Sequence, residues 1–298
     1  FFGSVAGYFG ALFIGVALVN AGVWWASAPF VIVLTFAICR LFVLQHDTGH
    51  HSLFETRAQN DLAGYILSIF TFTPYRAMQY NHNQHHAYLG NLDHRETTEI
   101  HTMTLREWNA APFKTRLWYR LYRNPLILLP VGGLFTYFLN YRWPKNTRIV
   151  GVLGVIGHNV MLFGWLYTLY LLAGWTGLGV LAVAVGIAAV LGVFMVFLQH
   201  NFEDTYWERR PDLDPQVAAL QGSSCLDFGW FFDFAVANIT LHDIHHFNAR
   251  IPSYRLRACH YNLPDDMAPH RVKFGEAIRA LGLKLWDEDQ KRLVPFPA

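Results

Sequence analysis

Residues 28–51 read APFVIVLTFAICRLFVLQHDTGHH, an apolar run that ends in three closely spaced histidines. The run from Ala28 to Leu44 is long enough to cross the hydrocarbon core of a bilayer as a helix, which takes about 17 to 25 residues. His46, His50 and His51 follow directly, so a helix leaving the membrane would hold them rigidly. This stretch predicts an integral membrane protein with a histidine site at the end of one span.

Charged residues are absent from two long windows. The chain has 298 residues, of which 53% are hydrophobic and 15% are charged, whereas soluble domains carry about 25% charged residues. Asp, Glu, Lys and Arg are missing from residues 1–39 and from residues 149–198. Each window accommodates two spans. We therefore expect an all-α membrane fold with four transmembrane helices in two hairpins, near residues 5–20, 28–44, 150–172 and 178–198. The shorter apolar pieces at 62–73 and 126–139 favour interfacial or re-entrant segments.

The basic residues predict the orientation. Lys and Arg number 23, with Arg40 at the end of the second span, 11 in residues 46–148 and 11 after His200. The positive-inside rule places the segments 45–148 and 199–298, and both termini, on the cytosolic side. We expect one membrane domain over residues 1–298 that contacts anionic lipids on this face rather than nucleic acid. Its histidines would form a site in a cytosolic helical cap.

Two further histidine clusters repeat the first. They read HNQHH at residues 82–86 and HDIHH at residues 242–246. On a helix, residues three or four apart share a face, whereas adjacent residues point about 100° apart. Imidazole is a common ligand of iron, zinc and copper. The clusters offer more imidazoles than one ion accepts, so the pattern predicts two metal ions.

Other polar residues near the spans extend this candidate site. His200, at the end of the fourth expected span, is a further candidate ligand. His158, inside the third, is either functional or part of a helix–helix hydrogen bond. Four acids are candidates to orient the imidazoles from behind: Asp47, Glu203, Asp204 and Asp243.

The three clusters resemble the histidine boxes of the membrane fatty acid desaturases. Residues 199–207, QHNFEDTYW, resemble the segment after the fourth span of acyl-lipid desaturases, and residues 245–256, HHFNARIPSYRL, resemble the HHxxxRIPxYxL stretch of their Δ12/ω6-like branch. The resemblance implies a di-iron centre with O2 as co-substrate. By similarity to stearoyl-CoA desaturases it also implies the following ligands, with His50 left open: His46, His51, His82, His85, His86, His200, His242, His245 and His246.

The implied activity is the introduction of a cis double bond into a lipid-linked acyl chain. The sequence has no dinucleotide fingerprint, cysteine cluster or cytochrome b5 haem motif, so we expect an external electron donor, either ferredoxin or cytochrome b5. Arg116, Arg120 and Arg123 are candidates to dock an acidic carrier. The expected location is the bacterial inner membrane, a plastid membrane or the endoplasmic reticulum.

Two alternative functions remain at this point. A di-iron hydroxylase or ketolase of alkanes, sterols or carotenoids would use the same histidine boxes, and the HHFNARIPSYRL stretch favours desaturation over it. A histidine-rich metal transporter would place its ionisable ligands near the bilayer midplane. Here the clusters lie outside the spans, which argues against transport.

Overall fold

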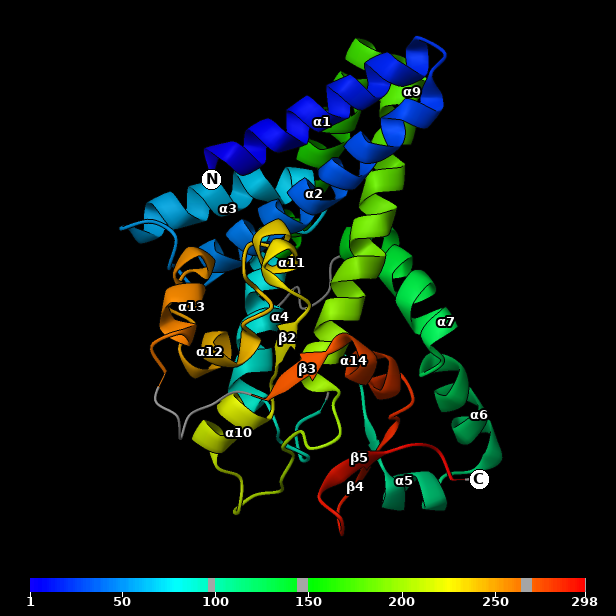
Figure 1. Ribbon diagram of the computed structural model, residues 1–298, viewed down its shortest axis with the longest axis vertical. Coiled ribbons are helices and arrows are strands. Elements are labelled where there is room, and N and C mark those ends of the chain that lie inside the picture. Colours follow the sequence, from blue (N-terminus) through cyan, green and yellow to red (C-terminus); the bar gives the residue numbers. More distant parts are fainter. Residues whose placement is uncertain (96–99, 144–149, 264–269, 298) are drawn as a thin grey trace. The chain divides into compact units, whose positions relative to one another are not determined.

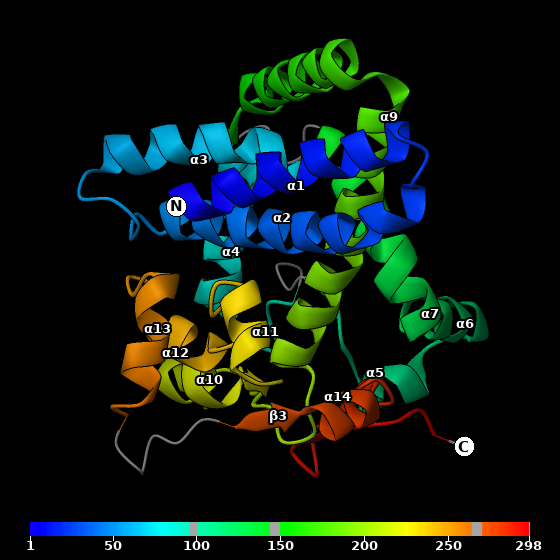
Figure 2. The ribbon, with the colours of Figure 1, turned by 45° about the horizontal axis from the view of Figure 1, so that its top comes forward.

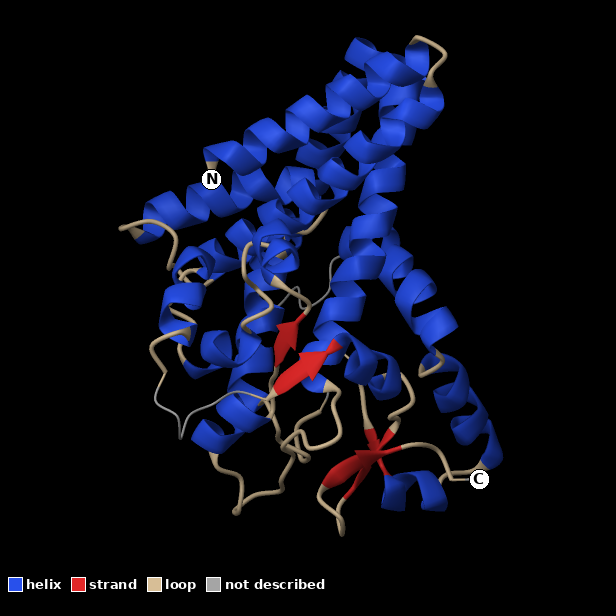
Figure 3. Ribbon diagram, viewed as in Figure 1, coloured by secondary structure: helices blue, strands red, loops and turns tan. Residues whose placement is uncertain are grey.

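The computed structural model describes residues 1–95, 100–143, 150–263 and 270–297. Residues 96–99, 144–149 and 264–269, which belong to the two expected cytosolic segments, lie outside the described part, as does residue 298. The fold is mainly helical, with a few short strands (Figure 3). The chain forms two compact units. The first comprises Phe1–Tyr80, Gly132–Gly192 and Phe234–Ala237, and the second comprises Asn81–Val131, Val193–Asp233 and Asn238–Ala298.

The first unit begins with two apolar helices that lie side by side (Figures 1 and 2). Helix α1 (Phe2–Asn20) is joined through the 3-10 turn η1 (Trp24–Ser27) to α2 (Ala28–Gly49). Gly22 has a φ of 78° in the connection, a conformation that glycine adopts without steric cost. Pro29 stands in the first turn of α2, where its missing N–H is no loss. These helices coincide with the first two expected spans.

Helix α9 (Val152–His200) covers nearly all of both remaining expected spans, but its backbone is not helical at Gly174 (φ 59°, ψ −158°). A Cβ atom built on Gly177 would lie 3.2 Å from the Leu169 side chain. Eight residues of straight helix would separate these positions by about 12 Å. The chain therefore turns back at Gly174, and α9 consists of two helices, residues 152–173 and 175–200.

Three helical stretches among the described residues are long and apolar enough to cross a membrane. They are Phe2–Asn20, Trp24–Gly49 and Val152–His200, the last being the pair joined at Gly174. Large apolar side chains stay exposed along them; Leu153, for example, is 82% exposed. Such exposure on a helix that is apolar all round is typical of a surface that contacts lipid. The chain is a membrane protein.

The apolar pieces expected to be interfacial or re-entrant are short helices. The first, expected over residues 62–73, lies mostly in α3 (Arg57–Thr71). This helix begins with a capping box between Thr56 and Gln59 and ends where Phe72 adopts a φ of 61°. The second forms α7 (Pro125–Ile127), the π-helical segments η2 (Leu128–Gly132) and η3 (Phe135–Leu139), and the 3-10 turn η4 (Asn140–Arg142).

A Cβ at Gly133 would meet the Ala189 carbonyl oxygen at 2.9 Å, so this close backbone approach requires glycine.

The second unit is a mixture of short helices and strands. Helix α4 (Tyr75–Tyr88) leads into it, and it contains α5 (Leu105–Ala110), α6 (Phe113–Tyr122), α10 (Pro215–Gln221), α11 (Trp230–Ala235), α12 (His242–Phe247), α13 (Ser253–His260) and α14 (Phe274–Ala280). Strands β1 (Met103–Thr104), β4 (Leu285–Asp287) and β5 (Arg292–Val294) form one sheet, with β1 parallel and β5 antiparallel to β4. Strands β2 (Cys225–Asp227) and β3 (Arg271–Lys273) pair in parallel.

These two small sheets correct the expectation of an all-α fold. Each strand has only two or three residues, which is too short for the alternating pattern by which a strand is recognised in a sequence. Each parallel pairing joins distant parts of the chain, for example Met103 with Leu285. One sheet borders a core formed by Leu92, Trp207, Trp286 and Leu293. The sheets therefore join segments of this unit that are distant in the sequence.

Candidate metal centre

Two helices present histidines in the spacing that the sequence indicated. His82, His85 and His86 lie on α4, and His242, His245 and His246 lie on α12. Helix α12 has only six residues, so packing rather than intrinsic helix stability must hold it. Ile244 supplies that packing, because it is 2% exposed and belongs to a cluster with Cys225, Leu241 and Leu256. The three histidines of α12 are buried as well, with exposures from 1% to 8%.

Four histidines of the second unit form the first group, which we call the quartet: His85, His200, His242 and His246. Their Nε2 atoms make a closed ring. The separations are 3.1 Å from His85 to His200, 3.1 Å from His200 to His242, 3.0 Å from His242 to His246 and 3.3 Å from His246 to His85. A point equidistant from four nitrogens so spaced lies about 2 Å from each, which matches a metal–nitrogen bond.

The protonation of the quartet also suits a cation. The Nδ1 atom of His200 lies 2.9 Å from the Gly222 carbonyl oxygen, which can only accept, so Nδ1 carries the proton and Nε2 keeps its lone pair. Burial, reinforced by the neighbouring histidines, lowers the pKa of His246 well below its ordinary value. Neutral imidazoles whose nitrogens converge this closely are the state in which histidine binds metal. The quartet therefore fits a metal ion.

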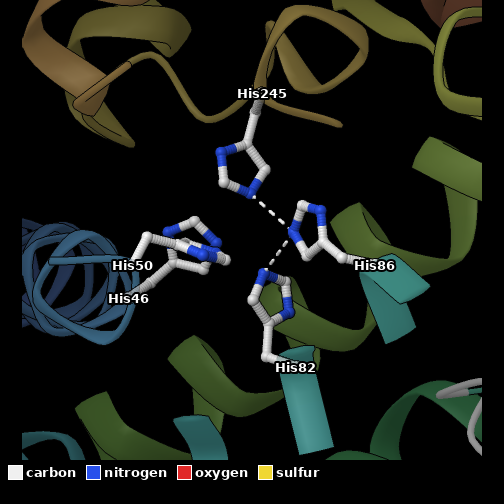
Figure 4. A group of neighbouring side chains, drawn as sticks. All are labelled: His46, His50, His82, His86 and His245. Carbon is white, nitrogen blue, oxygen red and sulfur yellow. Dashed lines mark hydrogen bonds between the residues drawn. The ribbon is translucent and has the colours of Figure 1, made fainter. Parts of the chain in front are cut away.

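Three more histidines of the second unit converge in the same way, and we call them the triplet: His82, His86 and His245 (Figure 4). The Nε2 atom of His86 lies 2.9 Å from that of His82 and 3.0 Å from that of His245. One Nε2 atom cannot donate to one neighbour and also offer a lone pair to another, because it carries either a hydrogen or a lone pair. A metal ion would satisfy all three nitrogens at once.

The first cluster belongs to the first unit, at the end of α2. His46 stands in its last turn and His50 caps it, and their ring centroids lie 4.8 Å apart (Figure 4). His51 follows with a φ of 55°, in the left-handed region, and its Nε2 lies 3.2 Å from Oδ1 of Asp61 on α3. The one-residue change in backbone conformation sends adjacent imidazoles to different partners. His50 stays with His46, and His51 joins a carboxylate.

Asp61 is the centre of a network in the first unit that sequence reasoning missed. Its carboxylate accepts hydrogen bonds from the Tyr75 hydroxyl at 2.9 Å and from Arg76 Nη2 at 2.8 Å. Burial acts to raise the pKa of Asp61, but these bonds and that of His51 hold it below its ordinary value. Tyr75 Oη also lies 3.0 Å from the Thr48 carbonyl oxygen. The network ties the end of α2 to α3 and to the beginning of α4.

The four acids that we expected behind the imidazoles differ in their surroundings. Asp47 is buried, with Oδ1 3.4 Å from His46 Nδ1. Asp243 is fully buried, and burial raises its pKa to about 6 although backbone N–H groups of Ile244 and Asp243 act to lower it. Glu203 is exposed and pairs with Arg292, and Asp204 is also exposed. Glu203 and Asp204 therefore do not orient the imidazoles.

Two other expectations have structural outcomes, and His200 has a partner that was not expected. His158 forms a helix–helix hydrogen bond, with Nδ1 3.1 Å from Ser68 Oγ on α3. Arg123, expected on a docking surface, is 1% exposed and therefore cannot meet a protein carrier. The partner of His200 is the backbone carbonyl of Gly222. No side-chain signal identifies such a partner in a sequence, because every residue has a carbonyl group.

A histidine-rich site able to hold metal, in a chain with apolar helices of membrane-spanning length, defines the class of histidine-box membrane proteins. Comparison with known proteins gives the family. The sequence model of the family described as "Fatty acid desaturase" matches residues 22–277, and the chain belongs to this family. It is an enzyme, a fatty acid desaturase.

Curated relatives agree with this assignment. A "Fatty acid desaturase" of Bacillus subtilis (strain 168) is 31% identical over 303 residues, covering 98% of this chain and 83% of that protein. An "sn-1 oleoyl-lipid 12-desaturase" of Picosynechococcus is 22% identical, covering 89% of this chain and 78% of the relative. An "sn-1 acyl-lipid omega-3 desaturase (ferredoxin)" of Nostoc is 27% identical, covering 72% and 61% respectively.

Proposed function

We propose that this desaturase uses O2 to introduce a cis double bond into an acyl chain of a membrane glycerolipid, at a centre of two iron ions. The observation that carries the proposal is the convergence of imidazole nitrogens in two separate groups, the quartet and the triplet. When bound, a reduced iron pair supplies the activation of O2 that allows hydrogen to be removed from an unactivated methylene.

The quartet would hold one iron through His85, His200, His242 and His246. For the other iron, the triplet offers only three imidazoles, and we propose that His46 and His50 supply the rest. His46 and His50 lie four residues apart, as His82 and His86 do, and residues at this spacing on a helix share a face. The hydrogen bond of His51 to Asp61 supports a positioning role for His51, in place of the ligand role that the resemblance implied.

The remaining contribution of the protein is to orient the imidazole rings and to exclude water from the site. Gly222 fixes the His200 ring through Nδ1, which leaves Nε2 for the metal. His85, His242, His245 and His246 are buried, with exposures from 1% to 8%. An acyl methylene has no polar group for the protein to bind. Selectivity for the double-bond position must therefore come from the shape of an apolar channel.

We propose four membrane crossings: α1, α2 and the two halves of α9 on either side of Gly174. The uncharged connections near Gly22 and Gly174 would lie on one side, and the basic segments with the histidines on the cytosolic side. The segments 45–148 and 199–298 would then belong to one membrane domain. Labelling of introduced cysteines with a membrane-impermeant reagent tests this: residue 176 should react from outside and residue 262 from inside.

The substrate and the electron donor are proposed from the relatives. Two of them are named for acyl chains at the sn-1 position of lipids, and one of these names includes ferredoxin. We propose a lipid-bound acyl substrate and a ferredoxin-type donor. Arg116 and Arg120 lie near the Trp108 ring, at 6.0 and 5.2 Å from its centroid. Of the three docking candidates, these two remain for that role, because Arg120 is exposed and Arg116 is half-buried.

The decisive experiment is expression in a host that lacks the corresponding unsaturated acyl chains, together with a competent ferredoxin system. Lipid analysis should show a new cis-unsaturated acyl chain on glycerolipids, and the purified protein should contain two iron ions per chain. A hydroxylated product would support the alternative, a di-iron hydroxylase. Metal uptake by the cells without any new lipid would instead support a transporter.

A further inference from the structure

A small cavity lies in the second unit, directly beside two histidines of the quartet. Its volume is about 30 Å³, and the side chains that line it include His85, His200, Thr102, Arg123, Asn201 and Val196. A cavity needs about 10–15 Å³ of such volume to hold one water molecule. The cavity thus has room for one to three non-hydrogen atoms.

Arg123 places a positive charge in the wall of this cavity. The residue is 1% exposed. Its Nη1 donates to the Thr102 hydroxyl at 3.1 Å and to the His101 carbonyl at 3.3 Å, and its Nη2 donates to the Leu283 carbonyl at 3.1 Å and to the Asn201 amide oxygen. Every one of these acceptors is uncharged. The buried Nε has no hydrogen-bond partner among the described residues.

A second buried cation lies next to Arg123. Lys284 is 7% exposed, and its ammonium group donates to the carbonyl oxygen of Arg123 at 2.7 Å. Burial, together with the charge of Arg123, lowers the pKa of Lys284 to about 8. The two side chains are held by carbonyl, hydroxyl and amide oxygens, and the structure gives neither of them a carboxylate partner among the described residues.

A guanidinium stays protonated under all ordinary conditions. Burying such a charge without a counter-ion costs several kcal/mol, of which neutral hydrogen-bond acceptors offset only a part. An anion in the cavity would offset the rest. It could accept hydrogen bonds from Arg123 and from the Thr102 hydroxyl, whose oxygen already accepts from Arg123 and whose hydrogen remains to donate.

We propose that this cavity is a binding site for a small inorganic monoanion of one to three non-hydrogen atoms, held by Arg123 and Thr102 beside His85 and His200. Arg123 and the cavity define the site in the metal-free chain. A metal ion in the quartet would attract the anion further, and that part alone rests on the proposed function. Through this site, the concentration of the anion in the medium would affect an iron ion bound by the quartet.

Chloride is the probe, observed by broadening of its 35Cl resonance, with azide as the competitor. The purified protein is measured both as isolated and after treatment with a chelator. Azide should reverse the broadening in both preparations, and the metal-loaded protein should bind chloride more tightly. Thr102→Val should weaken chloride binding at least about tenfold, which corresponds to about 1.4 kcal/mol, because the variant loses a hydrogen bond to a charged group.

Val196→Phe should abolish the azide-reversible broadening, because the ring fills the cavity while Arg123 remains. Val183→Phe is the matched control: Val183 is on the same helix, is 55% exposed and does not line the cavity, so chloride binding should be unchanged. Equal broadening in wild type, Val196→Phe and Thr102→Val would mean binding at surface arginines and would overturn the proposal. So would a wild-type protein without azide-reversible broadening. Neither result depends on desaturase activity.

Discussion

The Nε2 atom of His51 lies 3.2 Å from Oδ1 of Asp61, although His51 is the direct neighbour of His50 in the first histidine cluster. Asp61 has a lowered pKa and is therefore an ionised carboxylate, which accepts a hydrogen bond from the imidazole N–H. Its further bonds to Tyr75 and Arg76 join α2, α3 and α4. Adjacent histidines in one motif thus have different surroundings: His50 lies beside His46, and His51 lies beside Asp61.

Replacing His51 and His50 separately tests this division. His51→Gln keeps a side-chain donor for Asp61, and we expect it to retain two iron ions with activity reduced by no more than about tenfold. His50→Gln should lose about one iron ion and most of the activity. Iron is measured by mass spectrometry on protein of verified fold. Loss of iron in His51→Gln, with two iron ions retained in His50→Gln, would restore the ligand role of His51.

The quartet and the triplet should lose iron independently of each other. His242→Ala removes a ligand from the quartet and His245→Ala removes one from the triplet. Each variant should bind about one iron ion per chain in place of two and lose activity at least about 100-fold, while the circular dichroism of the helices is preserved. His260→Ala, outside both groups, is the control and should keep both ions. A single variant that releases all the iron together would contradict two separately held ions.

Gly64 is required by the ring of Tyr75. A Cβ atom at position 64 would lie 2.3 Å from Cε2 of Tyr75, a fully buried side chain. We expect Gly64→Ala to destabilise the protein by about 1–3 kcal/mol, because the ring has no space to move. Gly154→Ala is the matched control, since a Cβ there meets nothing within 4 Å. Thermal unfolding in detergent measures both, and equal melting temperatures would refute the contact.

Lys284 should make stability depend on pH in the alkaline range. Burial and the nearby charge of Arg123 lower its pKa from 10.5 to about 8 in the folded protein. Between these values the unfolded chain binds the proton and the folded chain does not, so stability should rise with pH from about 8 to about 10.5. Lys284→Met should flatten that rise. Unfolding midpoints at several pH values measure the effect, and an unchanged pH profile in the variant would exclude Lys284 as its source.

Much of the fold followed from the sequence because the membrane imposes simple rules. A helix that crosses lipid must satisfy the hydrogen bonds of its own backbone and must be apolar on all sides. The uncharged windows therefore predicted α1, α2 and α9, and the histidine spacing predicted the faces of α4 and α12 that carry the imidazoles. Gly174 shows the limit of the prediction from sequence. A turn between two spans was expected in this region, and only the structure shows that it is made at one residue with a positive φ. The short strands gave no periodic signal.

The sequence by itself determined the residue types of the candidate site, which are clustered imidazoles spaced by helical turns. This pattern is typical of metal ligands. The tertiary structure decided which imidazoles share a group, because His85 and His86 are adjacent in the chain but point about one quarter turn apart, into the quartet and the triplet. It also decided that Arg123 is buried, that Gly222 fixes His200 and that His51 binds Asp61. These contacts join residues distant in the chain, and their partners are set by packing, which no local pattern encodes.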